Sequence, residues 1–159
     1  MMASGESFSE TYPAVPASVP LARAALTEFA KEAGASGERL DAVRLAASEA
    51  VTNAVMHAYG DARKAGDAGP AAIHVSAAYV QSEVWLLIAD AGSGLRVRDK
   101  SPGLGLGLAL IAQLADDLQI LSRGTGGTEL RMRFELRSPQ SRPPAGQPLG
   151  SVAMAVSPA

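Results

Sequence analysis

The sequence predicts an α+β fold, a two-layer sandwich with helices on one face of a mixed, mostly antiparallel sheet. The order of the segments is the first reason: strand, helix, helix, strand, strand, helix, strand, strand. The second is the last strand, residues 129–136, in which apolar and charged side chains alternate. This alternation indicates one buried face and one solvated face, as antiparallel sheets allow.

The chain opens with a predicted edge strand and an amphipathic helix. The strand spans residues 11–15, because the proline within it is tolerated only at a sheet edge. Ser18 has the character of a helix N-cap, and the helix that follows ends near Gly34. Apolar side chains recur at every fourth position, which predicts the buried face: Leu21, Ala25, Phe29 and Ala33.

The second predicted helix is the longest and is opened by Ser36. It is rich in alanine, and Gly60 offers a left-handed cap at its end. Glu49, Asn53 and His57 are spaced by four residues and therefore share one helix face. A carboxylate and a carboxamide are costly to bury without partners. This stripe is therefore either solvated or part of a site.

Two strands, residues 72–79 and 84–89, are joined at Gln81-Ser82 and predict an antiparallel hairpin. The second strand is almost continuously apolar, which suits a central strand buried on both faces, and it runs into Asp90. The remaining elements are a polar loop at 95–102, a helix at 109–115, a strand at 118–121 and a hairpin loop at 124–127.

The composition predicts one folded domain at residues 1–137 and a flexible, proline-rich tail at 138–159. A formal net charge of −2 gives no electrostatic argument for nucleic acid. The absence of cysteine excludes disulfides and thiolate metal sites. Neither a secretory signal nor an apolar run long enough for a bilayer is visible, so we expect a cytoplasmic protein without membrane contact.

A candidate purine-binding motif follows the central strand. Asp90 is followed by Gly92 and Gly94, which allow a ligand to approach the backbone without Cβ collisions. A buried carboxylate at Asp90 needs hydrogen-bond donors, and the exocyclic amine of a purine is one. An ordinary Asp-Gly turn is the competing interpretation.

A glycine run leads into the third helix. A helix start presents unpaired N–H groups and a partial positive charge to anions, which favours a phosphate site. The run lacks the Lys-Ser/Thr pair of a P-loop and the glycine spacing of a dinucleotide fingerprint. A flexible hinge is the competing hypothesis. The residues concerned are Gly103, Leu104, Gly105, Leu106, Gly107 and Leu108.

Taken together, these pieces resemble the nucleotide-binding motifs shared by DNA gyrase, heat-shock chaperones, histidine kinases and mismatch-repair proteins. The resemblance covers about residues 10–136 and is ordered along the chain. In particular, residues 48–54 and the short loop at 95–102 resemble the bacterial anti-sigma-factor serine/threonine kinases. The matching pieces are Glu49-xxx-Asn53 with His57-Ala58-Tyr59 for the N box, and Asp90 to Gly94, Gly103 to Gly107 and Gly127-Thr128 for the three glycine boxes.

The resemblance implies the histidine-kinase-like ATPase fold, with ATP and Mg²⁺ as cofactors. It assigns magnesium to Asn53 and the adenine amino group to Asp90, with Thr128 in support. It makes Glu49 the base that accepts the proton of an attacking hydroxyl. The phosphates would be held by backbone amides near Leu104 to Leu108. His57 is interpreted as a structural histidine.

The partners implied by the resemblance are a sigma factor and an anti-anti-sigma protein, whose serine or threonine would be phosphorylated. The N-terminal strand and first helix would suit a homodimer or partner surface. Family members often carry an arginine in the second glycine box, where this chain has Leu104 and Leu106. An ATP-dependent binding switch without significant kinase activity therefore stays open, as does a purely structural interaction domain. The ATP-binding half of a histidine kinase is disfavoured, because no helical hairpin with an acceptor histidine precedes the motifs.

Overall fold

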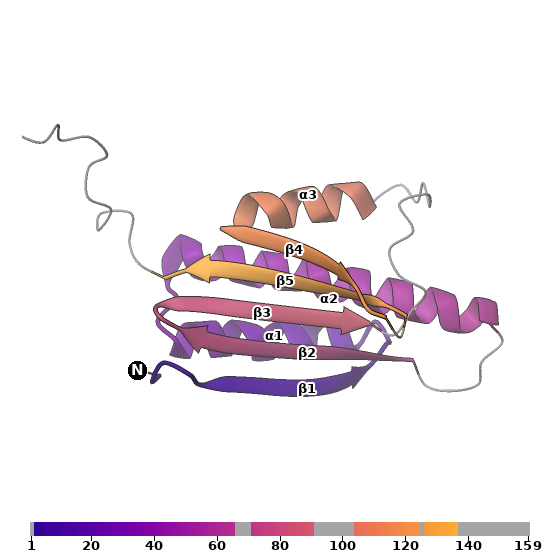
Figure 1. The fold of residues 1–159 in the computed structure, drawn as a ribbon, viewed down its shortest axis with the longest axis horizontal. Coiled ribbons are helices and arrows are strands. Elements are labelled where there is room, and N and C mark those ends of the chain that lie inside the picture. Colours follow the sequence, from indigo (N-terminus) through magenta and orange to yellow (C-terminus); the bar gives the residue numbers. More distant parts are fainter. Residues whose placement is uncertain (1, 66–70, 91–103, 125, 137–159) are drawn as a thin grey trace, which may run out of the picture.

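The computed structural model describes residues 2–65, 71–90, 104–124 and 126–136. Their strands form one five-stranded sheet in the order β1-β2-β3-β5-β4, and each neighbouring pair is antiparallel (Figure 1). The predicted α+β class and element order are confirmed. The elements are β1 (Ser7–Pro13), α1 (Ser18–Glu32), α2 (Gly37–Ala65), β2 (Ala72–Val80), β3 (Glu83–Asp90), α3 (Leu104–Leu114), β4 (Asp117–Ser122) and β5 (Thr128–Glu135).

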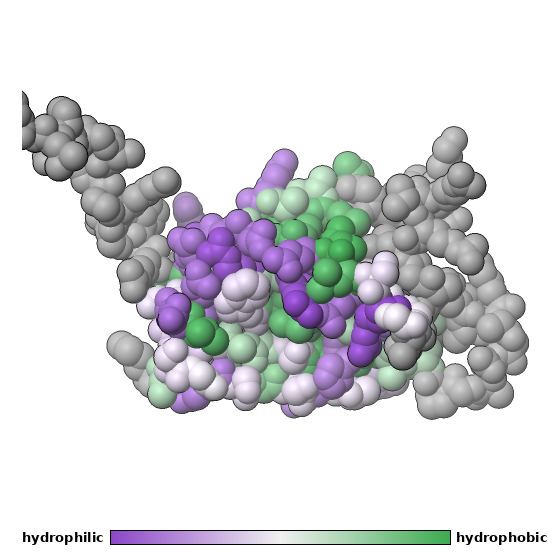
Figure 2. Space-filling model, in the orientation of Figure 1, coloured by the Kyte–Doolittle hydropathy of each residue, from purple (hydrophilic) through white to green (hydrophobic). Residues whose placement is uncertain are grey.

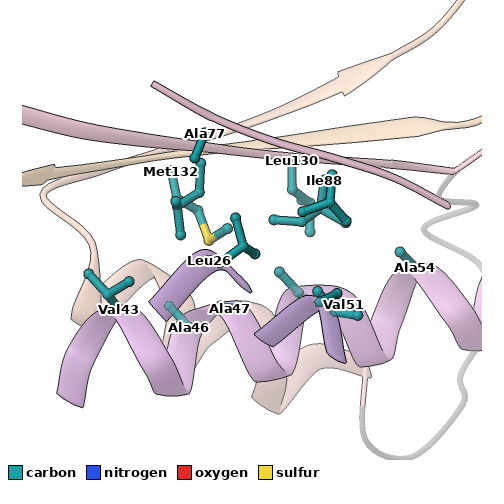
Figure 3. Packing of buried hydrophobic residues seen from close by; sticks show 14 of the residues in the cluster. Leu26, Val43, Ala46, Ala47, Val51, Ala54, Ala77, Ile88, Leu130 and Met132 are labelled. Atoms are coloured by element: carbon teal, nitrogen blue, oxygen red, sulfur yellow. The ribbon is translucent and has the colours of Figure 1, made fainter. Parts of the chain in front are cut away.

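The hydrophobic core lies between the helices and one face of the sheet (Figure 3). Alternate residues of β5 point into it, and Leu130, Met132 and Phe134 are buried as their alternation predicts. Small side chains on α2, among them Ala46, Ala47 and Ala50, are fully buried opposite them. Alanine at these positions lets the helix backbone approach the sheet closely, which fits a chain with few aromatic residues.

The central strand β3 corrects one prediction. Its central place in the sheet is as expected, but only alternate residues from Val84 to Ile88 are fully buried. Trp85 and Leu87 lie on the opposite face, where they are partly exposed. The helices cover one face only, so an almost continuous apolar sequence does not require burial on both sides.

The predicted buried face of the first helix is half confirmed: Phe29 and Ala33 are buried, whereas Leu21 and Ala25 are not. The buried side chains of α1 are Ser18, Ala22, Leu26, Phe29 and Ala30, whereas Leu21 is 61% exposed. Ser18 does not cap the helix, because the N-cap position is Ala17 and no side-chain cap hydrogen bond is present there. Leu21 and Ala25 fit the predicted four-residue spacing. The residues that pack into the core at this end of the helix lie one position further along, at Ala22 and Leu26.

Two further boundaries differ. The strand β1 ends at Pro13 and begins at Ser7, four residues before the predicted start. Its side chains are mostly exposed, so no apolar alternation marked its beginning. The helix α2 passes through Gly60 and ends at Ala65. One interior glycine costs a helix only about 1 kcal/mol, which neighbouring turns can offset.

The second face of the sheet is open and of mixed polarity, as Figure 2 shows from the side of the strands. Arg133 bridges Glu83 on β3 and Glu135 on its own strand, with N–O distances of 2.8 and 2.9 Å. The β2–β3 turn is tight, and Gln81 and Ser82 both have positive φ angles, 52° and 69°, as a type I′ hairpin requires. Among the described helices, none is both long and apolar enough to cross a membrane.

Candidate functional site

A pocket opens where the core face of the sheet meets α2 and α3. It is open to solvent, and the space between its walls, open solvent included, is about 290 Å³. The pocket brings together two of the three residues of the predicted helix stripe, the aspartate at the end of β3 and the threonine that opens β5. Its lining residues are Asn53, Ala54, His57, Ile88, Asp90, Leu108, Thr128 and Leu130.

The sheet supplies the floor of the pocket. Ile88 of β3 pairs with Leu130 of β5, and both side chains lie on the core face. Asp90 and Thr128 follow on the same face at the strand ends, and each is only 5% exposed. Two apolar side chains thus lead to a buried carboxylate and a buried hydroxyl, an arrangement that suits a flat, largely apolar ring with polar edges.

The chain enters β5 through a backbone conformation that requires glycine. Gly127 has a φ of 99° and accepts a hydrogen bond from the N–H of Arg123 at 3.0 Å, which closes the β4–β5 turn. A side chain is strained at this angle. The glycine of the third predicted box therefore fixes the turn that delivers Thr128 to the pocket.

The helix α2 supplies the polar wall. Asn53 and His57 lie one turn apart and both line the pocket. Among the described residues, Asn53 Nδ2 and His57 Nε2 are the buried side-chain polar atoms that have no hydrogen-bond partner. Buried polar groups are nearly always hydrogen-bonded, so two such atoms on one wall indicate a ligand that supplies the partners.

The third wall is the start of α3, which begins at Leu104, five residues before the predicted start at residue 109. The glycine run is therefore partly inside the first helical turn. The N–H groups of residues 104–107 have no acceptor within the helix, as at any helix N-terminus. Leu108 lines the pocket, whereas Leu106 is 80% exposed and points away from the core.

Gly107 brings this wall against α2. A Cβ atom added to Gly107 would lie 3.0 Å from Glu49 Oε2 and 3.5 Å from Asn53 Nδ2. Glycine therefore permits a close approach of the two helices at these side chains. Glu49 does not line the pocket itself, but it adjoins the pocket wall at Asn53.

Three predicted site residues, Gly92, Gly94 and Gly103, lie outside the described residues. Leu104 and Gly105 belong to the first turn of α3. Sequence reasoning did not assign Ile88 and Leu130 to the site, although each lies two residues from a predicted site residue on the same strand face. That spacing is the signal that would have found them.

The motifs imply a magnesium ion and a nucleotide at this pocket. The described residues contain no cluster of three or more His, Cys, Asp or Glu side chains that could hold a metal alone. The Asn53 amide oxygen is a hard ligand of the kind that Mg²⁺ accepts when phosphates and water complete its shell. The Asn53 Nδ2 atom without a partner among the described residues, the side-chain-free backbone at Gly107 and the buried Asp90 fit a nucleotide.

Comparison with known proteins agrees with this geometry. Residues 12–134 match the model of the histidine kinase-like ATPase domain. The serine-protein kinase RsbW of Bacillus licheniformis is 31% identical over 123 residues, which cover 68% of this chain and 73% of that protein. The anti-sigma F factor of Clostridium novyi is 27% identical over 128 residues, which cover 74% and 85% of the two chains.

A solved structure shows the same fold. The crystal structure of the RsbU and RsbW domains of a Mycobacterium tuberculosis protein superposes with a TM-score of 0.62 and 28% sequence identity. The match covers 82% of this chain and 32% of the mycobacterial chain. The chain belongs to the histidine kinase-like ATPase family, a class of ATP-using domains. Within it, the similarity is to serine-protein kinases and anti-sigma factors.

Proposed function

We propose that this protein is an ATP- and Mg²⁺-dependent serine/threonine protein kinase that acts as an anti-sigma factor. Its substrate in this proposal is an anti-anti-sigma protein, phosphorylated on a serine or threonine. Its relatives, a serine-protein kinase and an anti-sigma F factor, support both activities. The main structural support is the juxtaposition of Glu49, Asn53 and Gly107 beside a pocket with a buried carboxylate at its other wall.

The proposed nucleotide contacts follow from the three walls. The Asp90 carboxylate accepts a hydrogen bond from the adenine amino group, with Thr128 in support, and Ile88 and Leu130 contact the ring. Asn53 donates its oxygen to Mg²⁺. The backbone amides of residues 104–108 meet the phosphates at the positive end of α3. The glycines at 92, 94 and 103 belong to the same proposed binding site.

Glu49 is the proposed general base. It lies one helical turn from the proposed magnesium ligand and close to Gly107 in the first turn of α3, where the phosphates are expected. A carboxylate in this place can accept the proton of a serine or threonine hydroxyl as that oxygen attacks the terminal phosphorus of ATP, the bond from this phosphorus to the bridging oxygen breaks and ADP leaves. A binding switch that transfers no phosphoryl group would not need a general base at this position.

The test is phosphoryl transfer to the cognate anti-anti-sigma protein, measured by mass spectrometry with Mg-ATP. The wild-type protein should phosphorylate one serine or threonine, and Glu49→Gln should reduce the rate by roughly a hundredfold or more. Calorimetry of the same variant should give a Kd for Mg-ATP within about threefold of wild type, because the charge removed is not a proposed nucleotide contact.

The binding switch predicts a different result. In that case no transfer occurs, and nucleotide changes the affinity for the sigma factor equally in wild type and Glu49→Gln. If the wild-type protein binds ATP but does not phosphorylate the anti-anti-sigma protein, the binding switch replaces the kinase proposal. A homodimer through β1 and α1 remains a separate proposal, and sedimentation of the nucleotide-bound protein tests it.

A further inference from the structure

Exposed apolar side chains gather around Glu49, the proposed base. Seven large apolar side chains of the described residues are exposed, and three of them lie on the two helices that meet at Glu49. Leu45 and Met56 of α2 are 42% and 61% exposed, and Leu106 of α3 is 80% exposed. Single exposed apolar residues are ordinary, but a group of them beside a reactive carboxylate indicates a surface that another molecule covers.

The spacing along α2 puts Glu49 between the two apolar side chains of that helix. Leu45 is four residues before Glu49 and Met56 is seven residues after it, so all three share one side of the helix. At about 1.5 Å of rise per residue, they stand about 6 Å and about 10 Å from Glu49 along the helix axis. Leu106 adjoins Glu49 from α3, because the next residue, Gly107, lies against the Glu49 carboxylate. Apolar side chains therefore flank Glu49 both along α2 and across from α3.

Polar side chains on this side of α2 are engaged within the helix. The Asp41 carboxylate pairs with Arg44 at 3.2 Å, close to Leu45 in the sequence. The Thr52 hydroxyl, between Glu49 and Met56, donates a hydrogen bond to the carbonyl of residue 48 at 2.7 Å. A molecule that approaches Glu49 therefore meets apolar side chains around one carboxylate rather than a network of charges.

The chemistry of Glu49 identifies what covers this surface. A general base acts only when the hydroxyl that it deprotonates lies within about 3 Å, so the phosphoacceptor must rest on the residues around Glu49 in each transfer. We propose that Leu45, Met56 and Leu106 form the docking surface for the phosphoacceptor protein. This inference rests on the proposed function, because it takes Glu49 to be the base.

The surface also specifies the chemistry of its partner. To cover three exposed apolar side chains, the acceptor protein carries apolar side chains around its serine or threonine. Acidic side chains beside that hydroxyl are disfavoured, because the Glu49 carboxylate and the phosphates of ATP would repel them.

Substitutions on α2 test the surface without touching the nucleotide site. Leu106 is left unchanged, because its backbone amide belongs to the proposed phosphate site. Leu45→Gln and Met56→Gln remove the apolar side chains and keep good helix-forming residues. Each should raise the Kd of the anti-anti-sigma protein by roughly fivefold, and the double variant by roughly twentyfold or more. The measurement is calorimetry with Mg-ADP present, which occupies the nucleotide site and has no terminal phosphoryl group to transfer.

Transfer kinetics separate docking from chemistry. In the double variant, the KM for the acceptor protein should rise by a factor similar to its Kd. The kcat and the Kd of Mg-ATP should stay within about threefold of wild type, because docking contacts are the same before and during transfer. Glu49→Gln should give the opposite pattern, with a lower kcat and an unchanged affinity for the acceptor.

Val80→Gln is the matched control. Val80 is 41% exposed, almost the same as Leu45, and it lies at the end of β2 away from Ile73, the residue that pairs with Asp90. The same loss of an exposed apolar side chain at this position should leave the Kd of the acceptor protein unchanged.

Four results would overturn the inference. Two are an unchanged acceptor affinity in the double variant and an equal loss of affinity in Val80→Gln. A loss confined to the sigma factor would assign the surface to that protein, and a change in sedimentation alone would assign it to a second copy of this chain. If a glutamine variant does not fold, Leu45→Ala and Met56→Ala are measured against the same expectations.

Failure of the proposed function is distinguishable from these results. If the wild-type protein binds the acceptor protein but transfers no phosphoryl group, the kinase proposal fails. The calorimetric comparison of the variants then still decides whether this surface docks the anti-anti-sigma protein.

Discussion

Glu49 Oε2 lies 3.0 Å from the point where a Cβ of residue 107 would stand. Glu49, the proposed base, can lie this close to the start of α3 because residue 107 has no side chain. This contact joins α2 to α3 at the edge of the pocket, and it places the conformation of Glu49 under the control of the second glycine box.

Substitution of Gly107 by alanine should separate folding from phosphoryl transfer. Alanine favours a helix over glycine by about 1 kcal/mol, so α3 itself is not weakened. The new methyl group forces the flexible Glu49 carboxylate to move, and a displacement near 1 Å can reduce a rate by about a hundredfold. We expect a rate at least roughly tenfold lower, measured by single-turnover transfer, with an unchanged Tm or a higher one.

Gly124→Ala is the control for this change. No atom of the described residues lies within 4 Å of a Cβ at residue 124, so the substitution meets open space there. Its transfer rate should equal that of wild type. A normal rate in Gly107→Ala would show that the position of Glu49 does not matter for transfer.

Asp90→Asn should weaken ATP binding and reduce its selectivity. A carboxylate accepts a hydrogen bond from the adenine amino group more strongly than an amide does, and hydrogen bonds to charged groups contribute about 1.5–3 kcal/mol. We therefore expect a loss of affinity of roughly tenfold or more by calorimetry. Wild type should prefer ATP to GTP, since guanine presents an oxygen in place of this amine. Equal binding of both nucleotides by wild type would refute the assigned role of Asp90.

Asn53→Ala should remove the magnesium dependence of nucleotide binding. The Asn53 amide is the proposed protein ligand of the metal, and its Nδ2 has no partner among the described residues. In wild type, added Mg²⁺ should strengthen ATP binding, whereas the variant should bind ATP equally with Mg²⁺ and with EDTA. Adenosine, which carries no phosphate, should bind wild type and variant alike. A magnesium effect that persists in Asn53→Ala contradicts this assignment.

Asp116 is predicted to be a stabilising residue remote from the pocket. Its Oδ2 accepts the N–H of Glu135 at 2.7 Å and lies 3.1 Å from Arg39 Nη1, so it ties α2 to the end of β5. Asp116→Ala should lower the free energy of unfolding by about 1–2 kcal/mol in urea titrations. The exposed Asp41–Arg44 pair offers the control, because Asp41→Ala should change the free energy of unfolding by less than about 0.5 kcal/mol.

Tyr12 predicts an alkaline loss of stability. Partial burial, together with the hydrogen bond to Glu10, raises the pKa of the phenol from 10.0 to about 12. The folded state therefore holds this proton more tightly than the unfolded chain. The resulting stability is complete below pH 10.0 and is lost as the pH rises towards about 12. Urea titrations across this range should show a steeper loss in wild type than in Tyr12→Phe; parallel curves would contradict the pKa shift.

Most of the fold was predictable because the signals were local. The alternation along residues 129–136 and the Gln81-Ser82 turn each depend on neighbouring residues only. What failed depended on tertiary packing. The buried face of α1 is chosen by what packs on it, and the extension of α2 through Gly60 is not determined by the local preference of one glycine.

The site was predictable in its polar residues and not in its geometry. Asn53, Asp90 and Thr128 were expected to meet, and all three line one pocket. The contact of Gly107 with Glu49 was not predictable, because it depends on where α3 begins and how closely it approaches α2. The unsatisfied Nε2 of His57 is likewise invisible in a sequence, which shows a histidine but not whether its nitrogens have partners.

The pairing of β3 with β5 has a consequence for how this chain tolerates changes in length. Ala89 stands opposite Glu129, so the same register, extended by one residue, sets Thr128 opposite Asp90. A single residue inserted or deleted within β5 would turn Thr128 to the open face and Glu129 towards the pocket. The same change at Gly124, before the strand begins, would be absorbed by the turn. We therefore expect insertions and deletions to be tolerated before Gly127, in the β4–β5 turn, and not after it, within β5.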